Sequence, residues 1–135
     1  MKNLYQTFRP EGFGNLNIYL MMDDPQAFID FVQNVFAAEE ISRTEDEEGV
    51  IRNSILKIGD TCMMVAQVQK GFSHMSMAFY LYVNDTDSLY QKALDAGCEA
   101  LFEPMDMDYG DRQGGVKDPF GNYWWISKRL VEEAY

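Results

Sequence analysis

A short segment of this chain occurs twice, with the second copy 61 residues after the first. Residues 18–24 read Ile-Tyr-Leu-Met-Met-Asp-Asp and residues 79–85 read Phe-Tyr-Leu-Tyr-Val-Asn-Asp, so the tyrosine, the leucine and the last aspartate are identical. A second pair of segments follows in the same order, Gly-Asp at 59–60 and Gly-Asn at 121–122, at a spacing of 62 residues. Glycine followed by a short polar residue is typical of a turn between strands. The two spacings together predict two copies of one structural module.

Each copy of the repeated segment is followed by a helical pattern. Asp24 and Pro25 are typical of a helix start, and apolar residues then recur at helical spacing. In the second copy Asp85 precedes a helix that we expect to end before Gly97. The sequence therefore predicts helices over 24–37 and 86–96, and strands over 15–22, 39–44, 50–58, 62–68, 77–83, 99–102, 112–117 and 122–128.

Each half of the chain thus has the order βαβββ, which makes the fold class α+β. A chain of 135 residues is too short for two independent domains, so we expect a single domain over residues 1–135, made of modules 14–70 and 75–129. The helix of each module covers only one face of its sheet. Two such modules are expected to form a curved, mostly antiparallel, cup-shaped sheet with the helices outside.

Alternation along the strands predicts which side chains line the cup, because successive residues of a strand point to opposite faces. Leu20 and Phe79 are expected to face the helices, and Cys62 to lie on the helix-facing side as a small core residue. An aromatic lining of this kind suits a planar or apolar small molecule, although the same residues could simply pack a core or a dimer interface. The predicted lining is Tyr19, Met21, Met63, Tyr80, Tyr82, Tyr123 and Trp125.

The charge balance limits the kinds of partner. The chain carries 22 acidic against 11 basic residues, a net charge of −11, which argues against nucleic acid and against an anionic membrane surface. A cationic ligand is compatible with this charge. The chain has no signal-like start and no apolar run long enough to span a membrane, so we expect a cytoplasmic protein with reduced Cys62 and Cys98.

The C-terminal part of the sequence carries the most specific motif. Residues 109–126 read Tyr-Gly-Asp-Arg-Gln-Gly-Gly-Val-Lys-Asp-Pro-Phe-Gly-Asn-Tyr-Trp-Trp-Ile. With the repeat, this string resembles the vicinal oxygen chelate superfamily of glyoxalases, bleomycin-resistance proteins and dioxygenases, and most of all its PhnB-like branch. The resemblance covers roughly residues 14 to 128 and implies paired βαβββ modules, a cup and a homodimer.

The resemblance also implies where a metal ion would bind. Metal-dependent members take one ligand from each of four strands, and those positions correspond here to Asn17, Met63, Ala78 and Trp125. None of the four is His, Glu or Asp, so this set is unsuited to a hard or borderline divalent ion. We therefore expect no metal and no other cofactor.

Other candidate residues have both a functional and a structural interpretation. Tyr109 and Arg112 are candidate ligand contacts, since an arginine near aromatic residues can orient a carboxylate or stack on a ring; an ion pair of Arg112 with Asp111 or Asp118 is the alternative. The segment 118–121 is expected to be a structural turn, and the glycines at 114–115 to allow close backbone approach or a bulge. His74 could act as a general base or be merely solvated.

Two functions remain open. The first is a metal-free binding protein for a small aromatic or cationic molecule, with Asn17, Tyr19, Met63, Tyr80, Tyr82, Tyr109, Arg112, Tyr123 and Trp125 as ligand-binding residues. The second is a glyoxalase-type lyase, isomerase or dioxygenase with a metal-dependent or unorthodox site, in which His74 or Tyr80 would serve as the acid–base group. A third possibility is that the aromatic face only forms the dimer.

Overall fold

The computed structural model describes residues 8–135, so the expectations for residues 1–7 lie outside the described residues. The chain divides into two compact units, Met1–Met75 and Ser76–Tyr135. Within the described part of the chain, no helix is long and apolar enough to cross a membrane.

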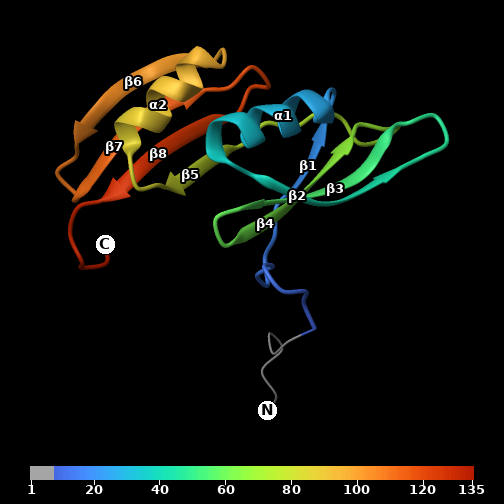
Figure 1. Ribbon diagram of the computed structural model, residues 1–135, viewed down its shortest axis with the longest axis horizontal. Coiled ribbons are helices and arrows are strands. Elements are labelled where there is room, and N and C mark those ends of the chain that lie inside the picture. Colours follow the sequence, from blue (N-terminus) through green and yellow to red (C-terminus); the bar gives the residue numbers. More distant parts are fainter. Residues whose placement is uncertain (1–7) are drawn as a thin grey trace. The chain divides into compact units, whose positions relative to one another are not determined.

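The first unit is a four-stranded sheet with one helix (Figure 1). The chain order is β1 (Tyr19–Met22), α1 (Pro25–Phe36), β2 (Glu39–Glu45), β3 (Ile51–Ile58) and β4 (Thr61–Gln67). The strands lie side by side in the order β1-β4-β3-β2. The β1–β4 pair is parallel, whereas β4–β3 and β3–β2 are antiparallel.

The second unit has the same element order and the same sheet order. Its elements are β5 (Ala78–Tyr82), α2 (Thr86–Asp95), β6 (Glu99–Asp106), β7 (Asp111–Lys117) and β8 (Tyr123–Arg129), arranged as β5-β8-β7-β6. The α+β fold class with two βαβββ modules is therefore confirmed. The enclosure of a cup by the two modules stays a prediction.

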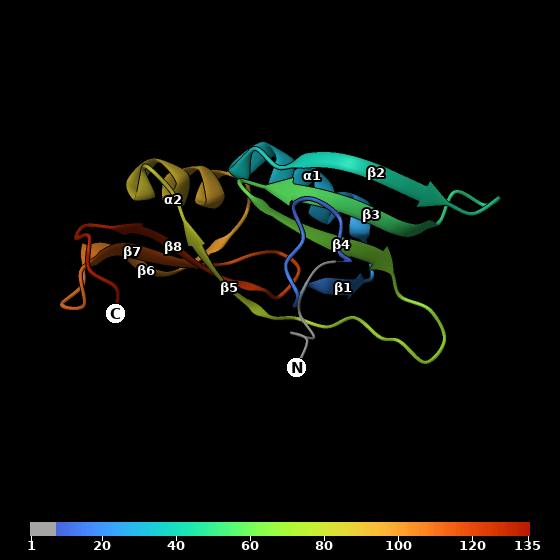
Figure 2. The ribbon, with the colours of Figure 1, turned by 90° about the horizontal axis from the view of Figure 1, so that it is seen from below.

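The helices begin where the sequence predicts, because an aspartate caps each of them. The Asp24 carboxylate accepts a hydrogen bond from the Ala27 amide at 3.1 Å, and Asp85 accepts one from the Ser88 amide, also at 3.1 Å. Helix α1 packs its apolar stripe on β3 and β4, and α2 packs on β6, β7 and β8. Figure 2 shows α2 covering one face of the second sheet, which leaves the opposite face uncovered by its own helix.

The register of β4 corrects one sequence-based prediction. Tyr19 pairs with Met64, and Leu20 pairs with Val65, so Met63 shares the helix-covered face with Val65 and is only 4% exposed. The prediction that Met63 lines the open face with Tyr19 is therefore wrong.

The prediction for Cys62 is wrong for the same reason, since it alternates with Met63 and lies on the side away from α1. Its amide donates to the Gly12 carbonyl at 3.0 Å, and an added Cβ on Gly12 would come within 2.7 Å of its sulfur. Residue Cys62 is nevertheless buried, as expected.

The predicted facing of Met63 assumed that residues 59–60 and 121–122 occupy equivalent positions in their turns. The turn between β3 and β4 consists of residues 59–60, whereas residues 118–122 connect β7 to β8. The longer second turn shifts the spacing by one residue. The strand pairs give the true correspondence, since Tyr80 pairs with Trp125 as Tyr19 pairs with Met64. Met64 is thus the counterpart of Trp125.

The turn at 118–122 is held together by one buried carboxylate. Asp118 accepts hydrogen bonds from the amides of Phe120 and Asn122 at 2.9 and 2.8 Å. Its other oxygen accepts from the Asn122 side chain at 3.0 Å and from the indole of Trp124 at 2.8 Å. Asn122 in turn accepts from the Met77 amide at 3.0 Å, which ties the turn to the start of β5. These contacts give the turn the structural role that the sequence predicts.

The two glycines of β7 lie against aromatic rings on both faces of the sheet. A Cβ on Gly114 would lie 2.9 Å from the ring of Tyr90 in α2, and one on Gly115 would lie 2.3 Å from the ring of Phe102 in β6. Any larger residue would collide with these rings. The predicted close approach is therefore present, on both sides of one strand.

Candidate ligand-binding face

The face of the second sheet away from α2 carries a group of exposed aromatic side chains. Tyr80 and Tyr82 of β5 pair with Trp125 and Ser127 of β8, and Tyr123 lies two residues before Trp125 on the same face. Tyr80 is 47% exposed and Tyr82 is 53% exposed. Exposed rings of this size at one face are typical of a binding surface. We call Tyr80, Tyr82, Tyr123 and Trp125 the aromatic face.

The rings of the aromatic face contact one another. The Tyr80 and Tyr82 ring centroids are 5.4 Å apart, and Tyr123 meets Trp125 edge-on at 5.9 Å. The ring of Phe102, from β6, lies 6.5 Å from that of Trp125. These are the spacings of packed aromatic pairs, which hold each ring in place. The face therefore offers ordered rings on which a planar molecule could stack.

A buried carboxylate accepts a hydrogen bond from one residue of the aromatic face. Asp111 at the start of β7 has no exposed surface and accepts a hydrogen bond from the Tyr80 hydroxyl. The Tyr135 hydroxyl donates to the same carboxylate at 2.5 Å, and the Arg129 guanidinium donates to its other oxygen at 3.0 Å. The Tyr82 and Tyr135 hydroxyls are hydrogen-bonded to each other at 2.5 Å. We call Asp111, Tyr80, Tyr82, Arg129 and Tyr135 the Asp111 cluster.

The cluster keeps Asp111 ionised. Burial alone raises the pKa of Asp111, but hydrogen bonds from Tyr135, Tyr80 and Arg129 outweigh burial and leave the pKa below its ordinary value. Burial and the bond to Asp111 raise the pKa of Tyr80. At neutral pH the cluster therefore contains one carboxylate anion and protonated phenols that donate to it.

A neutral network continues from the cluster along the same face. The buried side chain of Gln113 accepts from the Tyr109 hydroxyl at 2.6 Å and donates to Ser127 at 2.7 Å. Tyr109 thus reaches this face from the loop between β6 and β7. Of the predicted ligand-binding residues, the second sheet brings together Tyr80, Tyr82, Tyr109, Tyr123 and Trp125.

Arg112 lies on the other side of β7. Its guanidinium donates to Asp87 of α2 at 2.7 and 2.8 Å and to Asp106 of β6 at 3.0 Å. The strand alternates, so Arg112 points toward α2 whereas Asp111 and Gln113 point away from it. Arg112 therefore does not share a face with the other candidate ligand contacts of the second sheet. The alternative, an internal ion pair, is present, but its partners are neither Asp111 nor Asp118.

The predicted ligand-binding residues Asn17 and Tyr19 belong to the first unit. Both polar atoms of the Asn17 side chain bond the backbone of Gly14, at 2.9 Å to the amide and 2.8 Å to the carbonyl. Asn17 borders a hollow of about 480 Å³ that Phe13, Leu16 and Thr61 also line. Tyr19 is exposed on the face of the first sheet opposite α1.

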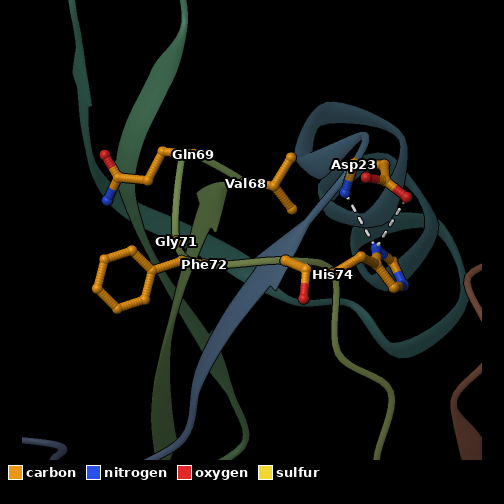
Figure 3. Close-up of a pocket in the computed structure, with 7 residues that line it drawn as sticks. Asp23, Val68, Gln69, Gly71, Phe72 and His74 are labelled. Carbon is orange, nitrogen blue, oxygen red and sulfur yellow. Dashed lines mark hydrogen bonds and ion pairs between the residues drawn. The ribbon is translucent and has the colours of Figure 1, made fainter.

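His74 lies beside another hollow of the first unit, of about 510 Å³ (Figure 3). Its Nδ1 accepts a hydrogen bond from the Asp23 amide at 3.0 Å, and an oxygen of the Asp23 carboxylate lies 3.5 Å from the same nitrogen. Figure 3 shows the imidazole turned toward Asp23 at the end of β1. The Nδ1 atom thus ties the loop that carries His74 to the end of β1.

Comparison with known proteins agrees with this fold. The model of the Glyoxalase/Bleomycin resistance protein/Dioxygenase superfamily matches residues 15–126, which is most of the chain. The protein belongs to this superfamily. An uncharacterized protein of Mycobacterium bovis is 32% identical over 128 residues, covering 87% of this chain and 84% of the relative.

Solved structures with this fold are similar as well. TioX from Micromonospora sp. ML1 has a TM-score of 0.70 at 23% identity, covering 88% of this chain and 98% of TioX. A PhnB protein from Bacillus cereus has a TM-score of 0.65 at 16% identity, covering 84% of this chain and 98% of that protein. These likenesses show the fold, and one of the similar structures is a PhnB protein.

The residues at the superfamily's metal positions do not fit a divalent ion. With the register corrected, these positions are Asn17, Met64, Ala78 and Trp125. The amide of Asn17 is bonded to Gly14, Ala78 has no donor atom, and the indole of Trp125 has no ligand nitrogen lone pair. The thioether of Met64 is a soft ligand. In residues 8–135 as a whole, no group of three or more His, Cys, Asp or Glu could hold a metal ion.

Sequence reasoning missed the residues that bind the tyrosine hydroxyls. The sequence predicts Asp111 only as a possible partner of Arg112. It predicts no site role for four further residues, Gln113, Ser127, Arg129 and Tyr135. Alternation along 111–117 places Asp111 and Gln113 on one face, which could have identified two of them. Nothing in the sequence pattern relates Tyr135 to Asp111.

Proposed function

We propose that this glyoxalase-superfamily protein binds a small aromatic or cationic molecule on the aromatic face, without a bound metal ion. The observation that carries the proposal is the group of contacting rings on one face of the second sheet, one of which, Tyr80, donates its hydroxyl to a buried, ionised carboxylate. Rings provide stacking area and attract cations through their faces. A net charge of −11 also favours a cationic ligand over an anionic one.

The binding test uses three probes of different chemistry: toluene, p-cresol and benzyltrimethylammonium. Saturable binding of at least one, measured by chemical-shift titration of the protein, supports the proposal. Tyr123→Ala is expected to weaken binding at least fivefold, because it removes a ring from the aromatic face. Phe72→Ala, which removes an exposed ring from a loop of the first unit, is the matched control. The proposal fails if no probe binds, or if both variants bind as the natural protein does.

The metal-free part of the proposal rests on the donor chemistry at the four metal positions. It is tested by metal analysis of the purified protein, and by melting curves with nickel, zinc, manganese or iron(II). We expect substoichiometric metal and no shift of several degrees with any ion. Stoichiometric metal or such a shift would contradict this part and favour the second candidate.

The second candidate is an enzyme of the superfamily, a lyase, isomerase or dioxygenase. The contacts of the two acid–base candidates favour binding over this alternative. Tyr80 donates its proton to a carboxylate and has a raised pKa, so it is a poor acid near neutral pH. Nδ1 of His74 is bonded to the Asp23 amide.

We also propose a homodimer in the cytoplasm, as the sequence predicts. The exposed rings of the aromatic face could pair two copies of the chain as well as bind a ligand. Size-exclusion chromatography of Trp125→Ala, together with probe binding by this variant, distinguishes dimerisation from ligand binding. Loss of the dimer together with unchanged probe binding would assign the face to dimerisation and contradict its use by a ligand.

A further inference from the structure

The other members of the Asp111 cluster hold the hydroxyl of Tyr135 as they would hold a bound phenol. It donates to the Asp111 carboxylate at 2.5 Å and is bonded to the Tyr82 hydroxyl at 2.5 Å. The guanidinium of Arg129 lies 4.2 Å from the centroid of its ring. One end of the ring is thus fixed by a buried anion and its face by a cation. Together these groups recognise both the hydroxyl and the aromatic ring of a phenol.

Tyr135 is largely exposed and lies outside the sheet. Tyr135 is 72% exposed, and residues 130–135 form neither helix nor strand after β8 ends. The segment is anchored through the Glu133 carbonyl, which accepts from Arg129 at 3.1 and 2.7 Å. The Tyr135 ring can therefore leave the cluster without any strand separating. Its departure would remove one hydrogen-bond donor from a carboxylate that has no exposed surface.

We propose that the position of the Tyr135 phenol is a binding site for the phenolic hydroxyl of a small ligand, and that Tyr135 occupies this site until the ligand displaces it. The inference rests on the proposed function, because it names the ligand class of the aromatic face. An external phenol would donate to Asp111, bond Tyr82 and stack under Arg129. A tethered competitor acts at a high effective concentration, so removing it should strengthen binding of the external phenol.

The test compares p-cresol, the side-chain analogue of tyrosine, with toluene, which lacks the hydroxyl. The Kd of p-cresol is measured by calorimetry or NMR titration for the natural protein and for Tyr135→Ala. We expect at least a tenfold lower Kd in Tyr135→Ala and less than a twofold change for toluene. Val131→Ala is the matched control, since it shortens an exposed side chain of the same segment and should leave the Kd of p-cresol unchanged.

Two double variants show whether the tighter binding of p-cresol by Tyr135→Ala depends on the remaining residues of the Asp111 cluster. In the Tyr135→Ala background, Tyr82→Phe removes one hydroxyl partner and should raise the Kd of p-cresol at least threefold. Asp111→Asn in that background should raise it further, with circular dichroism confirming that the variant is folded. Equal binding of p-cresol by the natural protein, Tyr135→Ala and the double variants would overturn this inference.

Failure of this inference differs from failure of the proposed function. If p-cresol and toluene bind equally well and neither responds to Tyr135→Ala, the aromatic face binds rings but the phenol site does not exist. If no aromatic probe binds any variant, both proposals fail. A gain for both p-cresol and toluene in Tyr135→Ala would make Tyr135 a simple steric cover and would also overturn the phenol assignment.

Discussion

The Tyr80 hydroxyl donates its hydrogen bond to the carboxylate of Asp111, one strand beyond β8, which lies between them. Asp111 has no exposed surface, so its charge depends entirely on donors from the protein. This relationship joins an exposed residue of the aromatic face to a buried anion.

Replacing Asp111 should destabilise the fold in a pH-dependent way. Although burial by itself raises the pKa of Asp111, hydrogen bonds from Tyr135, Tyr80 and Arg129 leave it lowered. A lowered folded pKa contributes stability above the ordinary value near 4 and loses it as the pH falls through the folded pKa. Asp111→Asn should cost about 1–3 kcal/mol at pH 7 and much less near pH 3. Urea unfolding at both pH values measures the difference.

The control for this prediction is Asp106→Asn. Asp106 forms an exposed ion pair with Arg112 and should cost less than about 1 kcal/mol at pH 7. An equal loss of stability in the two variants would contradict the role assigned to burial of Asp111.

Replacing Gly115 by alanine should destabilise the second unit, because the new Cβ would lie 2.3 Å from the Phe102 ring. We expect a loss of about 1–3 kcal/mol, as for overpacking in general. Phe102→Leu should recover part of the loss in the double variant. Gly14→Ala is the control, since its nearest neighbour would be at an ordinary 3.5 Å. Additive effects of Gly115→Ala and Phe102→Leu would refute the collision.

Replacing Asp118 by alanine should strongly destabilise the turn before β8. The carboxylate accepts four hydrogen bonds, including one from the Trp124 indole. Leaving these buried donors unpaired should cost about 3 kcal/mol or more. Asp60→Ala in the corresponding turn of the first unit should change stability little, because Asp60 accepts only from Thr61, at 3.2 Å, among the described side chains. Thermal melts followed by tryptophan fluorescence would compare the two.

Replacing each methionine of β4 in turn tests the register. Met63 is buried on the face covered by α1, whereas Met64 is only half-buried on the other face. Met63→Ala should cost about 2–5 kcal/mol, and Met64→Ala clearly less. Chemical denaturation of both variants measures this. A larger loss of stability for Met64→Ala than for Met63→Ala would instead place Met64 under α1 and Met63 on the open face.

Much of the fold could be predicted from the sequence because its signals are local. An aspartate directly before a helical apolar pattern is a local signal for a helix start, and Asp24 and Asp85 both cap helices as expected. The Asp118 turn has the same local character. Alternation within 123–129 also placed Tyr123 and Trp125 correctly on one face.

The errors concern relationships between strands. The facing of Met63 depends on its pairing with β1, which turn alignment shifted by one residue. The side of β7 on which Arg112 lies depends on where α2 packs. The contact between Asp111 and Tyr135 joins the start of one strand to a segment beyond the end of the next. No periodic pattern in the sequence records contacts of this kind.

The paired glycines of β7 restrict how this protein can diverge. Rings press on bare backbone from both sides at Gly114 and Gly115, so neither position has a direction in which a side chain could grow. Substitutions are therefore expected at the aromatic residues, where a smaller side chain still fits, and not at the two glycines. A library randomised at both positions and selected for folded protein should return glycine at each, while one randomised at Phe102 should return several apolar residues.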